Sequence, residues 1–246
     1  MSNKRICLDA GHYGKYNRSP VVKEYYESDM NWKLHLMLKK YLEGYGFEVI
    51  TTRAEQGEDP ELYDRGKTAA GCDLFMSLHS NAAYSTSETP NVGVHKNEYV
   101  DRVDVYATLD GRAHDLAKRL ADRIAEVMGT DQGGYVKTKK GSSGGEYYSV
   151  LRGAAAVGVP GLLIEHSFHT NTRAAKWLLD DANLDKLARA EAEILAKYYG
   201  MEAKPEQPQT LYRVQVGAYA VRANAEKQLA AIKAAGFTDA YITTKK

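Results

Sequence analysis

The feature that most constrains the fold is an alternation of strand-like and helix-like segments along most of the chain. Apolar or β-branched runs bounded by glycine or polar turns predict strands at residues 5–8, 48–52, 74–78 and 161–165. Apolar residues at helical spacing predict helices at residues 32–45, 62–70, 114–128 and 174–199. Alternating strands and helices are typical of α/β proteins, so we expect a twisted, largely parallel sheet flanked by helices.

Three ionisable side chains stand where predicted strands end. His12 follows the first strand, His79 follows the third, and Glu165 is the last residue of the fourth. In open parallel sheets the ligand crevice lies beyond the carboxyl ends of the strands. We therefore expect these three side chains to face one crevice.

Composition excludes some classes of partner. The 33 basic and 32 acidic residues give a formal net charge of +1, which favours no polyanion and predicts no nucleic-acid partner. Cys7 and Cys72 lie in apolar strand-like runs, so we expect buried thiols rather than a disulfide framework or a thiolate metal site. No apolar run approaches the roughly 18 residues of a membrane span, so we expect no membrane span.

The end of the chain differs in composition from the rest. The segment "GMEAKPEQPQT" loses the apolar period and contains two prolines, which predicts a linker. We expect a catalytic domain at residues 1–200, a linker at 201–210 and a small βαβ module at 211–246. A second polar, glycine-rich stretch, "KKGSSGGEYY" at residues 139–148, predicts a surface loop near the site.

The strand-end residues suit a catalytic zinc centre. Such a centre takes three ligands from His, Asp or Glu and leaves one position for water. His12 and His79 would supply two ligands, and the carboxylate could be Glu24, Glu27 or Asp29, which spacing alone does not separate. Glu165 ends the apolar run "GLLIE", so we expect a desolvated carboxyl with a raised pKa that acts as a general base. The pattern predicts a zinc hydrolase acting on a carbonyl compound.

Six motifs extend this interpretation: "DAGHYG", "ESDMN", "LYDRG", "SLHSNA", "YYSVLR" and "IEHSFHTN". In order and context they resemble the zinc-dependent N-acetylmuramoyl-L-alanine amidases of the amidase-3 family, over roughly residues 4–200. The resemblance implies His12, Glu27 and His79 as metal ligands, and so selects Glu27, with Glu165 as the catalytic carboxylate. It implies cleavage, by a zinc-activated water, of the peptidoglycan amide that joins the lactyl group of N-acetylmuramic acid to L-alanine of the stem peptide.

Two residues depart from the family pattern and bear on substrate preference. Tyr13 replaces a usual glycine, and His166 stands where a small or apolar residue is common. His166 and His169 lie just after Glu165 and could contact substrate, but we expect a structural or positioning role for both. Two other functions stay open: a zinc peptidase or deacylase acting on another amide, and a non-catalytic wall-binding protein, against which the retention of Glu165 counts.

The tail resembles a second family. Residues 212–237, "YRVQVGAYAVRANAEKQLAAIKAAGF", resemble one repeat of the SPOR-type domains that bind peptidoglycan glycan strands. A module of residues 211–246 is below the roughly 40 residues that usually fold alone, and its strands leave an open edge. We therefore expect tails of two chains to pair into a homodimer, with packing on the chain's own catalytic domain as the alternative.

The expected location follows from the amino terminus. "MSNKRICLD" contains no apolar signal core. We expect the protein to stay in the cytoplasm until cell lysis or a holin releases it to act on the wall. A phage endolysin and a bacterial autolysin fit this expectation equally.

Overall fold

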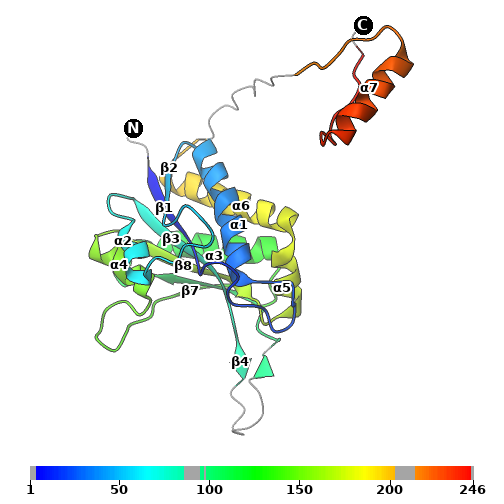
Figure 1. Ribbon diagram of the computed structural model, residues 1–246. Coiled ribbons are helices and arrows are strands. Elements are labelled where there is room, and N and C mark those ends of the chain that lie inside the picture. Colours follow the sequence, from blue (N-terminus) through cyan, green and yellow to red (C-terminus); the bar gives the residue numbers. More distant parts are fainter. Residues whose placement is uncertain (1–3, 86–94, 97, 203–213, 245–246) are drawn as a thin grey trace. The chain divides into compact units, whose positions relative to one another are not determined.

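The computed structural model describes residues 4–85, 95–96, 98–202 and 214–244, which belong to two compact units, Met1–Pro205 and Glu206–Lys246. The first unit contains a sheet with helices on both sides (Figure 1). Its strands are β1 (Arg5–Ala10), β2 (Glu48–Thr51), β3 (Leu74–Asn81), β4 (Tyr84–Ser85), β5 (His95–Lys96), β6 (Val103–Ala107), β7 (Gly134–Lys137) and β8 (Gly161–Phe168). Its helices are α1 (Glu27–Gly44), α2 (Leu62–Lys67), α3 (His114–Met128), α4 (Ser149–Ala156), α5 (Thr172–Leu179) and α6 (Asp181–Tyr199).

The main sheet has the strand order β2-β1-β3-β8-β6-β7, and β4 pairs with β5 separately. Strands β2, β1, β3 and β8 are parallel, whereas β6 is antiparallel to β8 and parallel to β7. The predicted α/β class with a largely parallel sheet is confirmed. The register places His79 of β3 directly beside Glu165 of β8.

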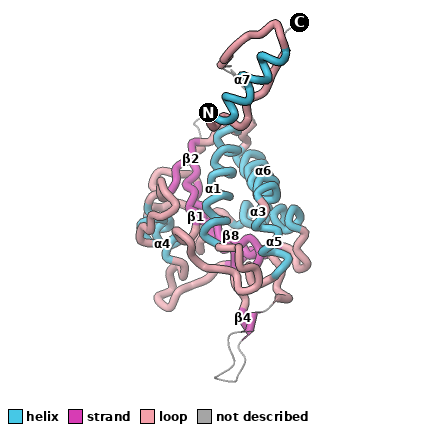
Figure 2. The backbone as a smooth tube through the Cα atoms, turned by 45° about the vertical axis from the view of Figure 1, so that its right-hand side comes forward, coloured by secondary structure: helices cyan, strands magenta, loops and turns pink. Residues whose placement is uncertain are grey.

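Two helical layers cover the sheet (Figures 1 and 2). The larger layer contains α1, α3, α5 and α6, and its apolar side chains form one core with the strands. On α1, Leu34, Leu38 and Leu42 repeat every four residues and are fully buried, which stabilises the fold by roughly 2 kcal/mol for each side chain. The smaller layer contains α2 and α4. These helices meet at Gly66 and Gly153, where an added Cβ would lie 2.0 Å from a backbone oxygen of the opposite helix.

The structure differs from the predicted elements in three places. The helix predicted at 174–199 is two helices, because the Asp180 side chain accepts hydrogen bonds from the amides of Ala182 and Asn183 and so caps a new helix. The first long helix begins at Glu27 rather than at Trp32. Strands β6 and β7 and helix α4 have no counterpart among the predicted elements, because the strand sequences VDVYA and GYVK are partly polar and the helix sequence SVLRGAAA contains a glycine.

The second unit contains α7 (Arg222–Ala234), which matches the helix predicted for the tail. No residue of α7 is buried. The described residues on either side of α7 form no strand, although strands were predicted there. A strand needs a hydrogen-bonded neighbour, and the described tail contains no second strand to supply one. None of the helices in the described residues combines the length and the apolar composition that crossing a membrane requires.

Candidate active site

Three of the predicted residues converge at the carboxyl ends of the parallel strands. His12 lies in the turn after β1, Glu27 is the first residue of α1, and His79 is near the end of β3. His12 Nε2 is 3.1 Å from Glu27 Oε2, and His79 Nδ1 is 2.9 Å from Glu27 Oε1. One donor atom from each residue lies within 4.8 Å of the others. Among the described residues, this group consists of His12, Glu27 and His79, and it does not include Glu24 or Asp29.

The turn that carries His12 is held by close backbone packing. His12 has a positive φ of 61°. A Cβ on Gly11 would lie 2.2 Å from His79 Cε1, so only glycine lets the two imidazoles approach. Arg65, which is 1% exposed, donates to the His12 carbonyl at 3.1 Å and pairs with Asp59 at 2.9 Å. The arginine of the "LYDRG" motif therefore fixes the backbone of the first histidine.

Glu27 is a buried carboxylate that stays ionised. Burial raises the pKa of Glu27, but hydrogen bonds from His12 and His79 outweigh that effect and hold the pKa well below its usual value. The Ser80 amide donates to Glu27 Oε1 at 3.0 Å, and the Asn17 side chain donates to Oε2. The carboxylate is therefore negatively charged at neutral pH and fixed in orientation.

A hydrogen-bonded chain decides which nitrogen of His79 is free. Ser77 Oγ donates its single proton to Asp9 Oδ2 at 2.6 Å, and Thr52 Oγ1 donates to Asp9 Oδ1 at the same distance. Ser77 Oγ must then accept from His79 Nε2, 3.1 Å away. The lone pair of a neutral His79 therefore lies on Nδ1 and faces the Glu27 carboxylate. Two acceptors facing each other require either an added proton on Nδ1, which makes the His79–Glu27 hydrogen bond described above, or a shared cation.

The donor set fits zinc. Two imidazole nitrogens and one carboxylate oxygen are ligands that catalytic zinc sites use, with a fourth position left for water. The bond from His79 Nε2 to Ser77 is the outer contact that commonly orients a ligand histidine. The acceptor pair of His79 Nδ1 and Glu27 Oε1 is the feature of this structure that a cation would satisfy.

Glu165 is next to this group and has the opposite electrostatic character. Burial first, and then the charges of Glu27 and Asp104, raise the pKa of Glu165 well above 4.5, whereas Lys137 lowers it. The side chain is 9% exposed, and Oε2 has no hydrogen-bond partner among the described residues. Because neighbouring strands lie about 4.8 Å apart, the register brings this free oxygen close to His79. A carboxyl with a raised pKa and a free oxygen suits proton transfer.

His166 and His169 are both fully buried. His166 Nδ1 donates to the His79 carbonyl at 2.9 Å, and its Nε2 is 3.0 Å from Glu191 Oε1. His169 Nδ1 is 3.0 Å from the Ser80 carbonyl oxygen and 3.0 Å from Ser80 Oγ. Neither ring reaches the solvent, so both act on the neighbouring backbone of β3.

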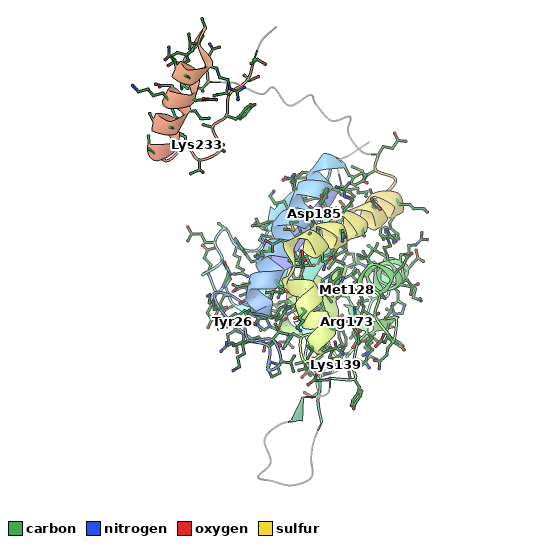
Figure 3. All side chains as sticks on the ribbon, turned by 90° about the vertical axis from the view of Figure 1, so that its right-hand side faces the viewer. Tyr26, Met128, Lys139, Arg173, Asp185 and Lys233 are labelled. Carbon is green, nitrogen blue, oxygen red and sulfur yellow. The ribbon has the colours of Figure 1, made fainter. Side chains whose placement is uncertain are left out.

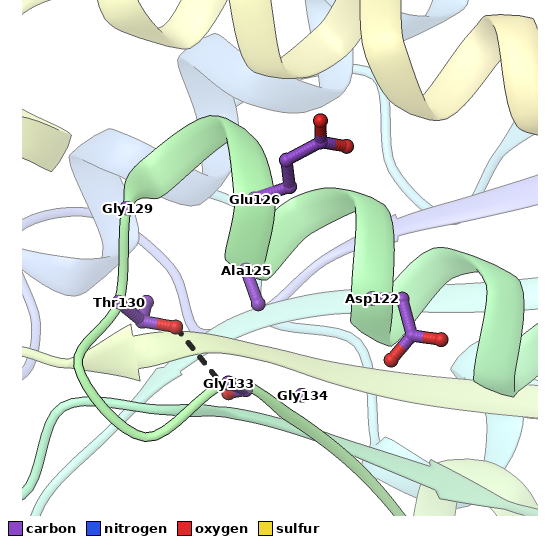
Figure 4. Close-up of a pocket in the computed structure, with 7 residues that line it drawn as sticks. All are labelled: Asp122, Ala125, Glu126, Gly129, Thr130, Gly133 and Gly134. Atoms are coloured by element: carbon purple, nitrogen blue, oxygen red, sulfur yellow. Dashed lines mark hydrogen bonds between the residues drawn. The ribbon is translucent and has the colours of Figure 1, made fainter.

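Sequence reasoning did not single out Asp9, Ser77 or Arg65. Asp9, Ser77 and Arg65 all stand inside quoted motifs, and an aspartate directly after a predicted strand is a signal that could have been used. At the edge of the site, Tyr13 and Tyr16 are exposed and their rings stack at 5.7 Å. A surface hollow between α3 and β7 is lined by none of the residues of the candidate site (Figure 4). Its lining residues are Asp122, Ala125, Glu126, Gly129, Thr130, Gly133 and Gly134.

The fold and the arranged carboxylates and histidines are those of an α/β amide hydrolase. Residues 6–197 match the model of the family described as N-acetylmuramoyl-L-alanine amidase, which covers most of the chain. The chain belongs to that family and is a peptidoglycan amidase. A SPOR domain model matches residues 182–244, starting inside α6. The resemblances to both families are confirmed.

Relatives extend along almost the whole chain. The N-acetylmuramoyl-L-alanine amidase CwlM of Bacillus licheniformis is 26% identical over 243 residues, covering 95% of this chain and 82% of that protein. The endolysin of Bacillus phage SPP1 is 29% identical over 206 residues, covering 82% of this chain and 68% of that protein. The structure of the amidase AmiC2 of Nostoc punctiforme has a TM-score of 0.64 at 22% identity, covering 80% of this chain and 97% of that one.

Proposed function

We propose that the catalytic unit cleaves peptidoglycan with a zinc ion held by His12, Glu27 and His79, and with Glu165 as the general base. The observation that carries this proposal is the convergence of the three donors beside a buried carboxyl with a raised pKa. Zinc, when bound in such a site, lowers the pKa of a water ligand to about 7 and polarises a carbonyl.

Each protein side chain has a separate task in this proposal. Ser77 orients His79 so that Nδ1 keeps its lone pair, and the hydrogen bonds around Glu27 keep that carboxylate ionised. Glu165 takes the proton of the attacking water and passes it to the departing amino group of L-alanine. A carbon–oxygen bond forms at the lactyl carbonyl, the carbon–nitrogen bond breaks, and the proton ends on the amine.

Digestion of purified cell walls combined with metal analysis tests the proposal. The wild-type enzyme should release new amino-terminal alanine and no new reducing sugar ends. His12→Ala, Glu27→Ala and His79→Ala should each lose zinc and activity together. Near-stoichiometric zinc in all three variants would remove these residues from the ligand set. Release of other amino termini instead would point to a peptidase acting on another amide.

The rest of the chain fits a wall-degrading enzyme with a binding module. We propose a catalytic domain at residues 1–200, a linker at 201–210 and a peptidoglycan-binding module at 211–246; the SPOR match supports the presence of the module, and the division into two units after Pro205 supports a linker there. The similarity to a phage endolysin supports a role at lysis, with the protein kept in the cytoplasm until lysis or a holin releases it. Wall binding by the full chain and by a chain ending at Glu202, each carrying Glu165→Gln, should differ at least several-fold.

We also propose that two tails pair with each other. The tail exposes apolar side chains, among them Val214 at 89%, Phe237 at 64% and Tyr241 at 74%. Exposed apolar side chains on unpaired extended backbone are stabilised when a second copy supplies both a cover and a strand partner. The full chain should therefore be a dimer in light scattering and the chain ending at Glu202 a monomer. Monomers in both cases at micromolar concentrations would refute pairing.

A further inference from the structure

A group of three charged side chains lies beside the candidate general base. Asp104 of β6 is the antiparallel partner of Glu165 in β8. Asp104 is 1% exposed, and its carboxylate accepts from Arg102 Nε at 3.0 Å and from Lys137 Nζ at 2.7 Å. One buried carboxylate is therefore flanked by two cations, and the group has an excess of positive charge.

The excess charge is accessible from solvent. The side chains of Arg102 and Lys137 are 32% and 31% exposed, although the carboxylate between them is buried. Asp101 is a second buried aspartate and is paired differently. It accepts hydrogen bonds from one cation, Arg173 of α5, and from the Ser167 hydroxyl (Arg173 is labelled in Figure 3). Asp104 thus has one more cation beside it than is needed to neutralise a buried carboxylate.

Aromatic rings adjoin the same cations. Lys137 Nζ lies 5.7 Å from the centre of the Tyr106 ring, which contacts the Tyr148 ring at 4.8 Å. Lys139 Nζ lies 3.7 Å from the centre of the Tyr147 ring (Figure 3 labels Lys139). Lys137 beside the half-buried Tyr106 ring is less hydrated than a lysine on an open surface, so a carboxylate that pairs with it gains more.

The spacing suits a peptide bound at Glu165. Directly opposite residues on antiparallel strands have Cβ atoms about 5 Å apart, which places the Asp104 carboxylate next to Glu165. The Lys137 ammonium is one ion-pair distance, 2.7 Å, from that carboxylate. Two residues of extended peptide span about 7 Å. A carboxylate on the second stem residue therefore reaches Lys137 when the first residue's amide lies at Glu165.

We propose that Lys137, supported by Arg102, binds a free carboxylate on the stem peptide and makes the enzyme favour stems whose second residue keeps that carboxylate over stems in which it is amidated. This inference rests on the proposed function, because Glu165 marks the position of the scissile amide. It assigns Lys137 to substrate selection and not to the chemical step.

The test uses the zinc-loaded full chain and two synthetic muramoyl peptides that differ only at the second residue, D-isoglutamate in one and D-isoglutamine in the other. The wild type should cleave the D-isoglutamate peptide with a kcat/KM about tenfold higher than that for the D-isoglutamine peptide. The difference should come mainly from a lower KM, as one charge-assisted hydrogen bond predicts. Lys137→Met should bring the ratio close to one, because any effect of the lost ammonium on the pKa of Glu165 changes turnover of both peptides equally and leaves the ratio to report the carboxylate contact. Lys137→Arg should keep most of the preference.

Lys4→Met is a matched control. Lys4 Nζ also lies 2.7 Å from an aspartate oxygen, that of Asp73, and 5.7 Å from the centre of a tyrosine ring, and its side chain is 37% exposed. It precedes β1 at the opposite ends of the parallel strands. The acid-to-amide ratio should be unchanged in this variant, because a loss of stability lowers both rates equally.

Two results separate the inference from the function on which it rests. Equal kcat/KM for both peptides in the wild type, or an unchanged ratio in Lys137→Met, would overturn the role of Lys137 and leave the amidase proposal standing. Cleavage of neither peptide and no release of alanine termini from walls would overturn the proposed function. Dissociation constants measured with Glu165→Gln should show the same tenfold ratio without turnover, and equal constants would also overturn the inference.

Discussion

The two units of the molecule differ in the kind of side chain that they leave to solvent. The first unit buries charged residues such as Asp9, Glu27 and Glu191 within hydrogen-bonded networks, together with its apolar core. The second unit exposes apolar residues such as Val214 and Phe237, and its helix buries nothing. Buried polar networks respond strongly to the loss of one member. The stability of the first unit should therefore respond to single substitutions near the site, whereas the stability of the tail should depend only on its binding partner.

The largest effect is expected where a buried pair supports the site. Glu191 of α6 meets His166, which in turn donates to the backbone of His79. Glu191→Ala should lower the free energy of unfolding by about 3 kcal/mol or more, since it leaves a buried partner unpaired. Urea unfolding at pH 7 measures this change.

Two variants test whether burial causes the effect. Glu191→Gln keeps a hydrogen-bonding side chain and should cost clearly less than the alanine variant. Glu126→Ala removes an exposed partner of Arg123 and should change the free energy of unfolding by less than about 0.5 kcal/mol. Equal losses in all three would mean that the buried pair contributes nothing specific.

The next effect concerns turnover. Glu165→Gln should keep zinc and wall binding and lose on the order of a hundredfold in kcat, equivalent to about 2.7 kcal/mol, because the amide cannot take up the proton. Glu146→Gln is the matched control. Glu146 is 8% exposed and burial raises its pKa, but it lies in the loop before α4 and accepts from the Leu109 amide in the loop after β6. Turnover at the wild-type rate in Glu165→Gln would reject the general base.

The pKa of Glu165 also predicts how stability depends on pH without zinc. The folded protein holds a proton on Glu165 at pH values above 4.5, where an unfolded glutamate has lost it. The free energy of unfolding therefore falls as pH rises from 4.5 toward the raised pKa. Glu165→Gln removes this fall, so its stability relative to the wild type should increase between pH 4.5 and 7. A constant difference in urea unfolding after chelation would contradict the raised pKa.

A smaller effect is expected from the contact that orients His79. Ser77→Ala should weaken zinc binding on the order of tenfold, because loss of an outer hydrogen bond frees the imidazole to rotate or change tautomer. Thr52→Val is an unusually close control, since both hydroxyls donate to Asp9 at 2.6 Å but only Ser77 contacts His79. Competition with a chromogenic chelator measures both affinities. Equal weakening would assign the effect to Asp9 instead.

Residues of this site differ in how far the sequence alone could place them. The strand-end positions of His12, His79 and Glu165 could be predicted because a parallel sheet brings its carboxyl ends together. Glu27 could not be separated from its neighbours by spacing, because the long helix begins there, five residues before its apolar pattern becomes clear. The network of Asp9 and Ser77 depends on the register of two strands, which the sequence does not reveal.

The same limit applies to the sheet. Strands β1, β3 and β8 of its parallel half contain apolar runs and could be predicted, whereas β6 and β7 are partly polar. The antiparallel direction of β6 is defined by its pairing with β8, and no local sequence pattern indicates it. Asp104 and Lys137 lie on these two strands, so the charged group beside Glu165 could not be predicted from the sequence.

The smallest effect on the first unit should come from removing the tail. The α6 helix ends at Tyr199 and is capped by Gly200, and the Met201 amide still donates to the Ala196 carbonyl at 2.8 Å. A chain ending at Glu202 keeps this contact and the Met201 side chain, which packs on the core. Its thermal midpoint should therefore match that of the full chain, while wall binding falls. A drop of several degrees, worth about 1 kcal/mol in a domain of this size, would show that the tail packs on its own catalytic unit and would favour that alternative over pairing between chains.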